Sequence, residues 1–342
     1  MLKVPAHQVA GHLAEEGHLG PLVDDCGCFY KPLQSGNRGS QEVEFYESLY
    51  SDARIPDHIR RYFPVFYGTK KVYASDGSGL HPHLVLQNLV SSYENPSIID
   101  IKIGSRTWYP QASEDYIRKS VEKDQTSSSL LLGFRISGLK AFVSKDSGFW
   151  KPKRKLLQTL AAEDVKLVLK KFVSSNAPEN HDVQPDCFFA SEVYGGSSGI
   201  LAQLLELKAW FEVQTIFHFY ASSALIVFDK ESVLKGKSSG AAVKLVDFAH
   251  VVEGAGVIDH NFLGGLCSLI KFIADIVAPP IEKCLSNGND TKSEKFSDGS
   301  LVVAPPIEKC LSNGNDTESE KCSDGSLSTA KSEPLSLDPR ED

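Results

Sequence analysis

The chain has 342 residues, of which 41% are hydrophobic and 23% are charged, proportions typical of soluble globular proteins. Its longest apolar runs are too short to span a bilayer, and we expect no secretory signal because the first residues lack a basic region followed by an apolar stretch. Seven cysteines scattered over so long a chain do not indicate a disulfide framework, which favours a reducing compartment, the nucleus or the cytoplasm.

Charge is distributed unevenly along the chain. The net charge is −8, but residues 277–342 hold 7 Lys or Arg against 13 Asp or Glu, so the rest of the chain is nearly neutral. Within that rest, residues 102–155 hold 12 basic and 5 acidic residues. A basic stretch in a neutral body indicates a polyanionic ligand.

Residues 1–90 are predicted to be rich in strands. Short alternating segments around turn residues predict strands, and apolar residues at helical spacing predict one helix. The predicted elements are a strand pair over 20–33 joined by an Asp/Gly turn, a helix over 42–51, and strands at 65–68 and 84–86 separated by a polar loop over 74–83.

Longer helices are predicted after residue 96, together with one buried strand, 243–248, that ends in a carboxylate. The helices are expected over 114–122, 161–172, 200–218 and 261–276. The chain up to residue 276 therefore reads as a two-lobed α+β body.

The last part of the chain contains a repeat. Residues 277–301 recur almost unchanged as residues 303–327, with a period of 26. Because the repeated unit is rich in Ser, Asn, Gly, Asp and Lys and has almost no apolar face, burial cannot offset its ordering entropy. We expect 277–342 to be a disordered tail with a tandem duplication, either an inert extension or a regulatory or docking segment.

The segment Pro96–Gly104 is the first candidate for chemistry. Its alternation places Ile99, Ile101 and Ile103 on one face of a strand and Asp100, Lys102 and Gly104 on the other. A strand that buries three isoleucines would present the carboxylate and the ammonium together, with Gly104 allowing a ligand or backbone to approach closely. An ion pair on a solvated strand is the alternative.

The pattern Pro-x-x-x-Asp-x-Lys-x-Gly of this segment is the signature of the inositol polyphosphate kinase family. The chain resembles plant multikinases of that family from about His7 to Ile276, most clearly in the segments 95–110, 127–138, 190–212 and 244–273. The resemblance implies a two-lobed kinase-like fold with an N-terminal ATP-binding lobe built on an antiparallel sheet (1–90). A larger mixed lobe (91–276) would hold the inositol phosphate site and a magnesium carboxylate, followed by the tail.

The same resemblance implies roles for five residues. Lys31 would contact the ATP phosphates. Asp100 would hold the ATP ribose or orient the reacting groups, and Lys102 would lie between the acceptor phosphate and the γ-phosphate. Asp247, in Val-Asp-Phe-Ala-His, would be the Mg²⁺ ligand, since magnesium is held by few carboxylates plus phosphates and waters. His250 would contact the inositol phosphate.

Adenine is expected to meet backbone groups of the linker at Gln87, Asn88 and Leu89. The family commonly has Glu-Asp at the first two of these positions. Backbone hydrogen bonds survive that exchange, whereas a carboxylate contribution would be lost. The chain has neither a G-x-G-x-x-G loop nor a Walker sequence nor an H-R-D loop, which argues against an ordinary protein kinase or P-loop enzyme.

The acceptor site needs several cations. Arg118, Lys119 and Lys123 lie in the segment that binds substrate in the family, and the last two are four residues apart and so share a helix face. A solvated helix face is the alternative for each of them.

The resemblance implies an ATP- and Mg²⁺-dependent kinase that converts inositol 1,4,5-trisphosphate to tetrakis- and pentakisphosphates at the 6- and 3-hydroxyls. Two alternatives stay open. The chain could also phosphorylate phosphoinositide lipid headgroups, or it could be a non-catalytic partner of transcription complexes that binds inositol phosphates.

Overall fold

The computed structural model describes residues 1–11, 19–176 and 183–278. The chain divides between Ile281 and Glu282, so every described residue belongs to the first part. Apart from residues 277 and 278, the tail predicted to be disordered lies outside the described residues.

The first sheet has four antiparallel strands in the order β1-β2-β4-β3. Its strands are β1 (Leu22–Val23), β2 (Cys28–Pro32), β3 (Phe66–Tyr73) and β4 (Leu80–Gln87). The predicted turn joins β1 to β2, because Asp24 Oδ1 accepts hydrogen bonds from the N–H groups of Cys26 and Cys28, each 2.9 Å long.

The predicted loop over 74–83 is too long, because β4 begins at Leu80. Pro82, inside the predicted loop, lies within the strand opposite Lys71. Its carbonyl oxygen accepts a 3.0 Å hydrogen bond from the N–H of Leu33, so this position needs an acceptor and not the donor that proline lacks.

The second sheet has five strands in the order β10-β9-β5-β6-β7, and every neighbouring pair is antiparallel. These strands are β5 (Pro96–Ile103), β6 (Phe134–Ser144), β7 (Gly148–Trp150), β9 (Ser223–Asp229) and β10 (Ala242–Val246). A separate pair is formed by β8 (Phe217–Phe219) and β11 (Val251–Glu253).

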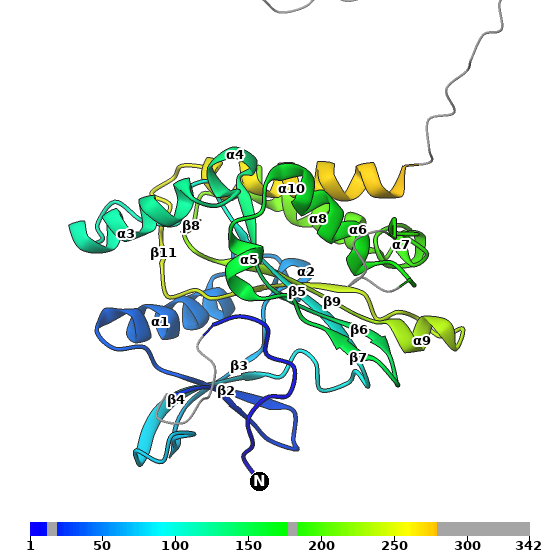
Figure 1. Cartoon of the computed structure of the whole chain (residues 1–342). Coiled ribbons are helices and arrows are strands. Elements are labelled where there is room, and N and C mark those ends of the chain that lie inside the picture. The colour runs from blue at the N-terminus through cyan, green and yellow to red at the C-terminus, as the bar shows by residue number, and fades with distance from the viewer. Residues whose placement is uncertain (12–18, 177–182, 279–342) are drawn as a thin grey trace, which may run out of the picture. The chain divides into compact units, whose positions relative to one another are not determined.

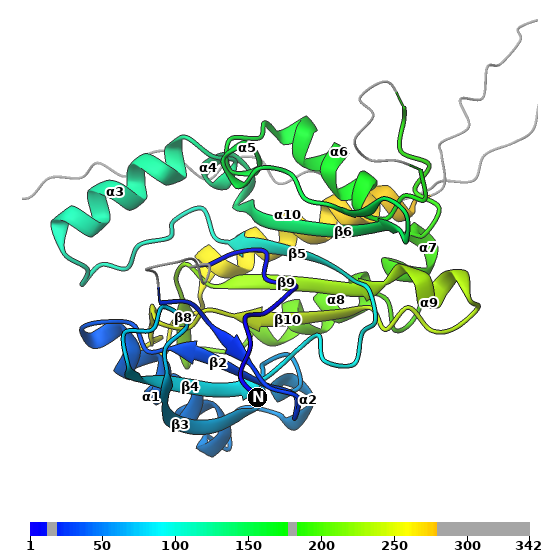
Figure 2. The same cartoon turned by 60° about the horizontal axis from the view of Figure 1, so that its bottom comes forward.

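The helices of the described residues vary from about one turn to about five turns in length. They are α1 (Asn37–Ser51), α2 (Asp57–Arg60), α3 (Glu114–Gln125), α4 (Ser129–Leu132), α5 (Arg154–Gln158), α6 (Ala162–Phe172), α7 (Ala190–Val193), α8 (Ile200–Phe211), α9 (Lys230–Leu234) and α10 (His260–Val277). In Figures 1 and 2, α8 and α10 cover one face of the five-stranded sheet, and its other face is turned toward the four-stranded sheet. The predicted α+β fold class is therefore confirmed.

The helix predicted over 200–218 is wrong in its second half, since α8 ends at Phe211. The side chain of Gln214 forms the turn that follows: its oxygen accepts the N–H groups of Ile216 and Phe217, each at 3.1 Å, and its nitrogen donates to the Phe217 carbonyl at 2.8 Å. These bonds replace the next helical turn and direct the chain into β8.

Helix α10 is long and apolar enough, by length and composition, to cross a membrane. It is also a core helix of this fold, because Phe262, Leu266, Leu269 and Ile273 are fully buried. Asp259 caps its N-terminus by accepting a 2.9 Å hydrogen bond from the N–H of Phe262.

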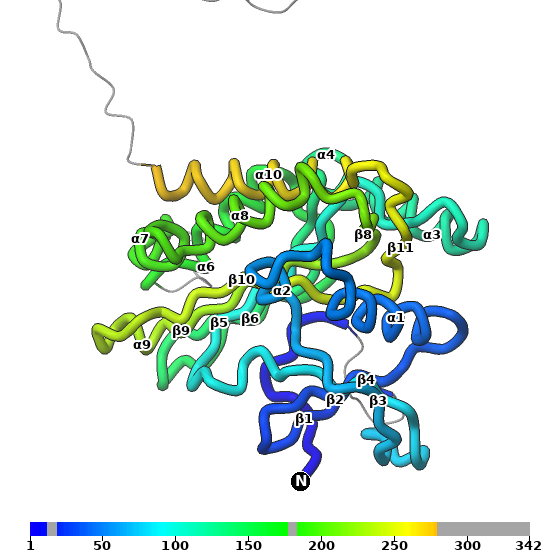
Figure 3. The backbone as a smooth tube through the Cα atoms, turned by 180° about the vertical axis from the view of Figure 1, so that it is seen from behind, coloured from blue at the N-terminus to red at the C-terminus, as the bar shows by residue number. Residues whose placement is uncertain are grey.

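One main hydrophobic core connects both sheets through α1. Figure 3 shows α1 and α2 from behind, between the four-stranded sheet and the rest of the fold. The ring centroid of Phe45, on α1, lies 4.3 Å from that of Phe248, 5.3 Å from that of Phe217 and 5.9 Å from that of Phe63. The predicted lobe boundary between residues 90 and 91 stays a prediction.

We predict that Phe45→Ala lowers the free energy of unfolding by about 3–5 kcal/mol, because a large buried ring is replaced by a cavity. Urea denaturation followed by tryptophan fluorescence measures this loss. Val213 is 73% exposed, so Val213→Ala should change stability by less than about 0.5 kcal/mol. Equal losses in the two variants would contradict the assignment of Phe45 to the core.

Candidate active site

A cavity of about 1280 Å³ is lined by residues of both main sheets. Eight of the residues to which the sequence assigns roles line it: Lys31, Gln87, Asn88, Leu89, Asp100, Lys102, Asp247 and His250. They come from β2, the linker after β4, β5 and the segment after β10. The fold therefore brings together side chains that are far apart in sequence.

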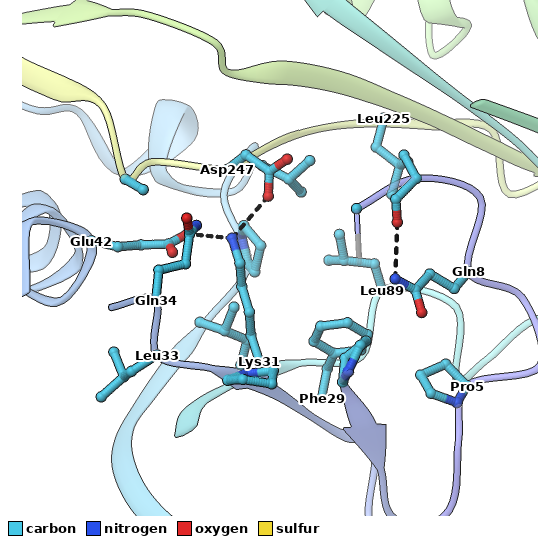
Figure 4. Close-up of a pocket in the computed structure, with 18 of the residues that line it drawn as sticks. Pro5, Gln8, Phe29, Lys31, Leu33, Gln34, Glu42, Leu89, Leu225 and Asp247 are labelled. Carbon is cyan, nitrogen blue, oxygen red and sulfur yellow. Dashed lines mark hydrogen bonds and ion pairs between the residues drawn. The ribbon is translucent and has the colours of Figure 1, made fainter. Parts of the chain in front are cut away.

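An ion-paired lysine links three elements at one end of the cavity. The ammonium of Lys31, on β2, lies 2.8 Å from a carboxylate oxygen of Glu42 on α1 and 2.8 Å from one of Asp247, which directly follows β10. Figure 4 shows both contacts. Glu42 also accepts a 3.2 Å hydrogen bond from the N–H of Phe248, which fixes the segment after Asp247 to α1.

These contacts keep both partners of the Lys31–Asp247 pair charged. Burial favours the neutral form of Lys31, but the charges of Asp247 and Glu42 outweigh it and raise the pKa of the ammonium above its ordinary value. Burial likewise opposes the charged form of Asp247, and the charges of Lys31 and Lys102 outweigh it, lowering the pKa of this carboxyl to about 2. Asp247 is therefore a carboxylate at neutral pH.

Glu42 is a member of the site that the sequence reasoning missed. Its side chain is 1% exposed and lies on the face of α1 that also buries Phe45, Tyr46 and Leu49. The spacing 42, 45, 46, 49 is that of one helix face. A glutamate within an apolar helical stripe was the available signal, because a buried carboxylate requires a charged partner.

Asp247 of the pair and the nearby Ala221 have left-handed backbone conformations. Asp247 has φ of 67° and Ala221 has φ of 53°, and such conformations cost about 1–3 kcal/mol outside glycine unless the surroundings enforce them. The hydroxyl of Ser222 donates a 2.8 Å hydrogen bond to the carbonyl of Asp247, and the ammonium of Lys102 donates to the carbonyl of Ala221. Strained backbone of this kind is concentrated at functional sites.

Strand β5 presents its two charged residues as its alternation predicts. Ile99, Ile101 and Ile103 are fully buried, whereas Asp100 and Lys102 line the cavity. A register shift in the pairing with β6 falls between Asp100 and Ile101.

Asp100 is 5% exposed, and among the described residues its Oδ1 atom has no hydrogen-bond partner. Burial, with the charge of Asp247, outweighs the attraction of Lys102 and raises the pKa of Asp100 to about 6. Burial also lowers the pKa of Lys102, although Asp247 and Asp100 oppose that change. A buried acid that lines a cavity and has an unpaired oxygen is a candidate binding group.

The packing of the protein, and not only a ligand, requires a glycine at position 104. Its φ is 108°, and a Cβ atom there would lie 2.6 Å from the side-chain nitrogen of Asn261. The N–H of Gly104 donates a 2.7 Å hydrogen bond to the carbonyl of Gly133. The close approach expected at this glycine is therefore made by α10 in this structure.

His250 lies between two tyrosine rings. Its ring centroid is 5.4 Å from that of Tyr109, nearly parallel to it, and 5.1 Å from that of Tyr116 on α3. Burial, together with the positive charges of Arg38 and Lys102, lowers the pKa of His250 to about 4. The imidazole is therefore neutral at pH 7, and its buried Nδ1 atom has no hydrogen-bond partner among the described residues.

The three basic residues of α3 differ in their surroundings. Arg118 and Lys119 both pair with Asp115 and are 76% and 71% exposed. Desolvation, together with the positive charges of Arg135, Lys102 and Arg154, lowers the pKa of Lys123 to about 8. Lys123 is exposed, as Arg118 and Lys119 are, and none of the three lines the described cavity.

A buried ion pair that the sequence reasoning did not identify holds α3 in place. Arg135 of β6 is 2% exposed and lies 2.8 Å from Asp124 of α3. Asp124 also accepts hydrogen bonds from the N–H and the hydroxyl of Thr107, at 2.9 and 2.8 Å. Helix α3 is therefore anchored next to the strand that carries Lys102.

Two backbone N–H groups of the linker already donate hydrogen bonds within the protein. The N–H of Gln87 donates to the carbonyl of Val65 and that of Asn88 to the carbonyl of Gly27, each over 2.8 Å. The Asn88 side chain accepts a 3.2 Å hydrogen bond from the N–H of Val90, which makes it a turn residue. Leu89 is therefore the linker residue best suited to meet a base with its backbone.

The described residues offer few side chains that could bind a metal ion at this site. No group of three His, Cys, Asp or Glu side chains within 1–11, 19–176 and 183–278 is arranged to hold a metal ion. Asp247 uses Oδ1 for Lys31, and its side chain is 43% exposed. An ionised carboxylate that faces a cavity fits Mg²⁺, which is usually bound through one or two carboxylates, phosphates and waters.

Two plant proteins are similar to this chain in sequence. Inositol polyphosphate multikinase beta of Arabidopsis thaliana is 58% identical over 282 residues, which cover 81% of this chain and 94% of that protein. Inositol polyphosphate multikinase alpha of the same plant is 56% identical, covering 82% and 98%.

Two solved inositol phosphate multikinases are similar in structure. One is 52% identical with a TM-score of 0.60, and the match covers 69% of this chain and 99% of that one. The other, Ipk2 of S. cerevisiae, was solved in complex with ADP and Mn²⁺; it is 20% identical with a TM-score of 0.57, covers 73% and 99%, and shows a shared fold.

The family model described as inositol polyphosphate kinase matches residues 83–274, more than half of the chain. With two plant relatives above 55% identity over most of both chains, the resemblance seen in the sequence is confirmed. The chain belongs to the inositol polyphosphate kinase family.

Proposed function

We propose that this chain is an ATP-dependent kinase that phosphorylates inositol polyphosphates. The observation that carries the proposal is the Lys31–Glu42–Asp247 network, which shares one cavity with Asp100 and Lys102. Phosphoryl transfer requires mainly positioning and charge neutralisation, and these residues supply fixed charges of both signs. The names of the plant relatives, inositol polyphosphate multikinases, support the same activity.

At the nucleotide end of the cavity, Lys31 would neutralise ATP phosphates while Glu42 keeps its ammonium in place. Asp247 would hold Mg²⁺ with the oxygen that Lys31 does not use, and the Mn²⁺ in the yeast multikinase is consistent with a divalent ion. When bound, the ion would neutralise charge on the phosphate oxygens. Leu89 and its neighbours would meet the adenine.

At the acceptor end, Lys102 would steady the charge that moves between donor and acceptor. Its ammonium already lies at the carbonyl of Ala221, so its position is fixed before substrate binds, which is the condition for electrostatic stabilisation of a transition state. Neutral His250 would contact the acceptor by hydrogen bonding, and Lys123 would pair with one of its phosphates.

Asp100 would accept a hydrogen bond from a hydroxyl of the ribose or of the acceptor. Its unused Oδ1 atom and its raised pKa of about 6 support this role, because a buried carboxylate without a full set of partners gains by binding a donor.

We extend the proposal to inositol 1,4,5-trisphosphate as substrate, with transfer to the 6- and 3-hydroxyls. Phosphoinositide headgroups as further acceptors, transcription-complex proteins as partners, and localisation in nucleus and cytoplasm stay predictions.

Incubation of the full chain with Mg-ATP and inositol 1,4,5-trisphosphate, followed by chromatographic separation of the products, tests the activity. We expect tetrakis- and pentakisphosphates from the wild type. Asp247→Asn should reduce turnover by at least about 10³-fold, because it removes the charge that would hold the metal. Asp57 is 94% exposed, and Asp57→Asn serves as a control with wild-type turnover. Full activity of Asp247→Asn would contradict the assignment.

Asp100→Asn should separate stability from activity. Because the folded protein raises the pKa of Asp100 from 3.8 to about 6, the fold favours the protonated form and loses stability as pH rises from about 4 to 6. Asparagine mimics that protonated form, so the variant should gain about 3 kcal/mol of unfolding free energy at pH 8 and almost none at pH 4.

Urea denaturation at both pH values measures this gain. Turnover at pH 8 should fall at least about tenfold, because the amide oxygen is a weaker acceptor than the charged carboxylate that it replaces. A stability gain that persists at pH 4, or turnover equal to that of the wild type, would contradict this account of Asp100.

Two variants of one helix test the acceptor site. Lys123→Ala should raise the KM for inositol trisphosphate about tenfold and leave the KM for ATP unchanged, because a phosphate contact is typically worth about 1.5–3 kcal/mol. Arg118→Ala should change both constants less than about twofold, since Arg118 pairs with Asp115 in water. An unchanged KM for inositol trisphosphate in Lys123→Ala would contradict the role of Lys123, and a rise of about tenfold in Arg118→Ala would show that Arg118 also contacts the acceptor.

A further inference from the structure

The segment Lys3–Gly11 lines the same cavity as the site residues, although no role has been assigned to it so far. In Figure 2 it is drawn in dark blue and runs from the four-stranded sheet across to the five-stranded sheet. The inference below concerns this segment and rests on the proposed function.

One end of the segment is attached to the four-stranded sheet. The N–H of Lys3 donates to the carbonyl of Val23 over 2.9 Å, and the N–H of Val23 donates to the carbonyl of Lys3 over 2.8 Å. This pair of bonds forms an antiparallel bridge to β1.

The other end is attached to the five-stranded sheet and to α5. The ammonium of Lys140, on β6, donates a 2.7 Å hydrogen bond to the carbonyl of Ala6, and Arg154 donates a 2.9 Å bond to the carbonyl of Gly11. The His7 ring packs edge-on against Phe149 of β7, with the centroids 5.6 Å apart. The segment thus spans from one sheet to the other.

Gly138 of β6 provides the closest contact. A Cβ atom at this position would lie 2.0 Å from the carbonyl oxygen of Val9 and 2.7 Å from its carbonyl carbon. The φ of Gly138 is not in the left-handed region, so its backbone would accept alanine. The absence of a side chain at Gly138 is therefore what allows the segment to lie against β6.

Across the cavity the segment faces an apolar surface. Figure 4 shows Pro5 and Gln8 on one side and Phe29 and Leu89 on the other, with the Gln8 side chain directed toward Leu225. Phe29 comes from β2, Leu89 from the linker and Leu225 from β9. A flat heterocycle with two apolar faces is the ligand that such opposed surfaces fit.

The segment lines this space and does not fill it. With the segment in place the cavity still measures about 1280 Å³, more than the roughly 300–1,000 Å³ of typical small-molecule sites. There is room for a nucleotide together with the segment.

We propose that Lys3–Gly11 is the outer wall of the adenine pocket and that Gly138 is the position at which this wall is docked. The wall keeps water from the outer face of the base, so displacing it weakens nucleotide binding. Acceptor binding should depend on it little, because Lys102 and Lys123 lie on β5 and α3, whereas β1, β6 and α5 supply the hydrogen bonds that attach the segment.

Gly138→Ala in the full chain tests the proposal, because the new methyl group meets the segment and Gly138 does not line the main cavity. We expect the Kd for Mg-ADP, measured by isothermal titration calorimetry, and the KM for ATP to rise about tenfold or more. The KM for inositol trisphosphate should stay within about twofold of the wild type. Hydrogen exchange of the peptide 1–11, measured by mass spectrometry, should become faster.

Gly264→Ala is the matched control, since a Cβ atom at Gly264 would meet nothing within 4 Å; it should bind Mg-ADP like the wild type. Lys140→Met is a second variant that removes the bond to Ala6 without adding bulk. It should shift Mg-ADP binding in the same direction as Gly138→Ala, and it decides the question if Gly138→Ala fails to fold.

Wild-type Kd values in the displaced variants, tighter Mg-ADP binding on displacement, or unchanged hydrogen exchange would overturn the inference while leaving the kinase assignment intact. A wild-type chain that binds no Mg-ADP would overturn both.

Discussion

The charge pairing around Lys31 is the interaction on which the rest of the site depends. Three elements supply its members: β2, the buried face of α1, and the residue after β10. If both carboxylates were absent, the ammonium would have to be solvated or neutralised, since an unpaired buried charge costs several kcal/mol. Through the N–H of Phe248, Glu42 also joins the pairing to the aromatic core. The site and the core therefore hold each other in place.

Four titratable groups near the cavity have pKa values shifted toward their neutral forms. Asp100 has a raised pKa of about 6, whereas the pKa values of Lys102 and Lys123 are lowered, Lys123 to about 8, and that of His250 falls to about 4. Each of these shifts arises mainly from burial, and the cations also repel one another. A polyphosphate brings negative charge to Lys102, Lys123 and the other cations. Ligand binding would therefore relieve the repulsion among these cations that the fold carries when empty.

The sequence predicted best what rests on local pattern. The alternation of Pro96–Gly104 and the spacing in Glu114–Glu122 reflect strand and helix periods directly, and both elements were found. The family signature located Asp100 and Lys102 in one cavity with Lys31. Glu42 and Asp124 escaped prediction because each is defined by a charged partner on another element, 11 residues away in sequence. Periodicity indicates which helix face a residue lies on, but it does not identify the partner that the residue meets there. The end of α8 escaped because a side chain, Gln214, replaces backbone hydrogen bonds.

The 216 positions that separate Lys31 from Asp247 have a consequence for biosynthesis. Contacts between residues far apart in the chain form slowly, because a long loop must close first. Chains emerge from the ribosome N-terminal end first, so β2 and α1 leave the ribosome well before the carboxylate that completes their pairing. Until residue 247 has emerged, Lys31 has only Glu42 as its partner. The centre of the site is therefore completed only after most of residues 1–278 have been translated.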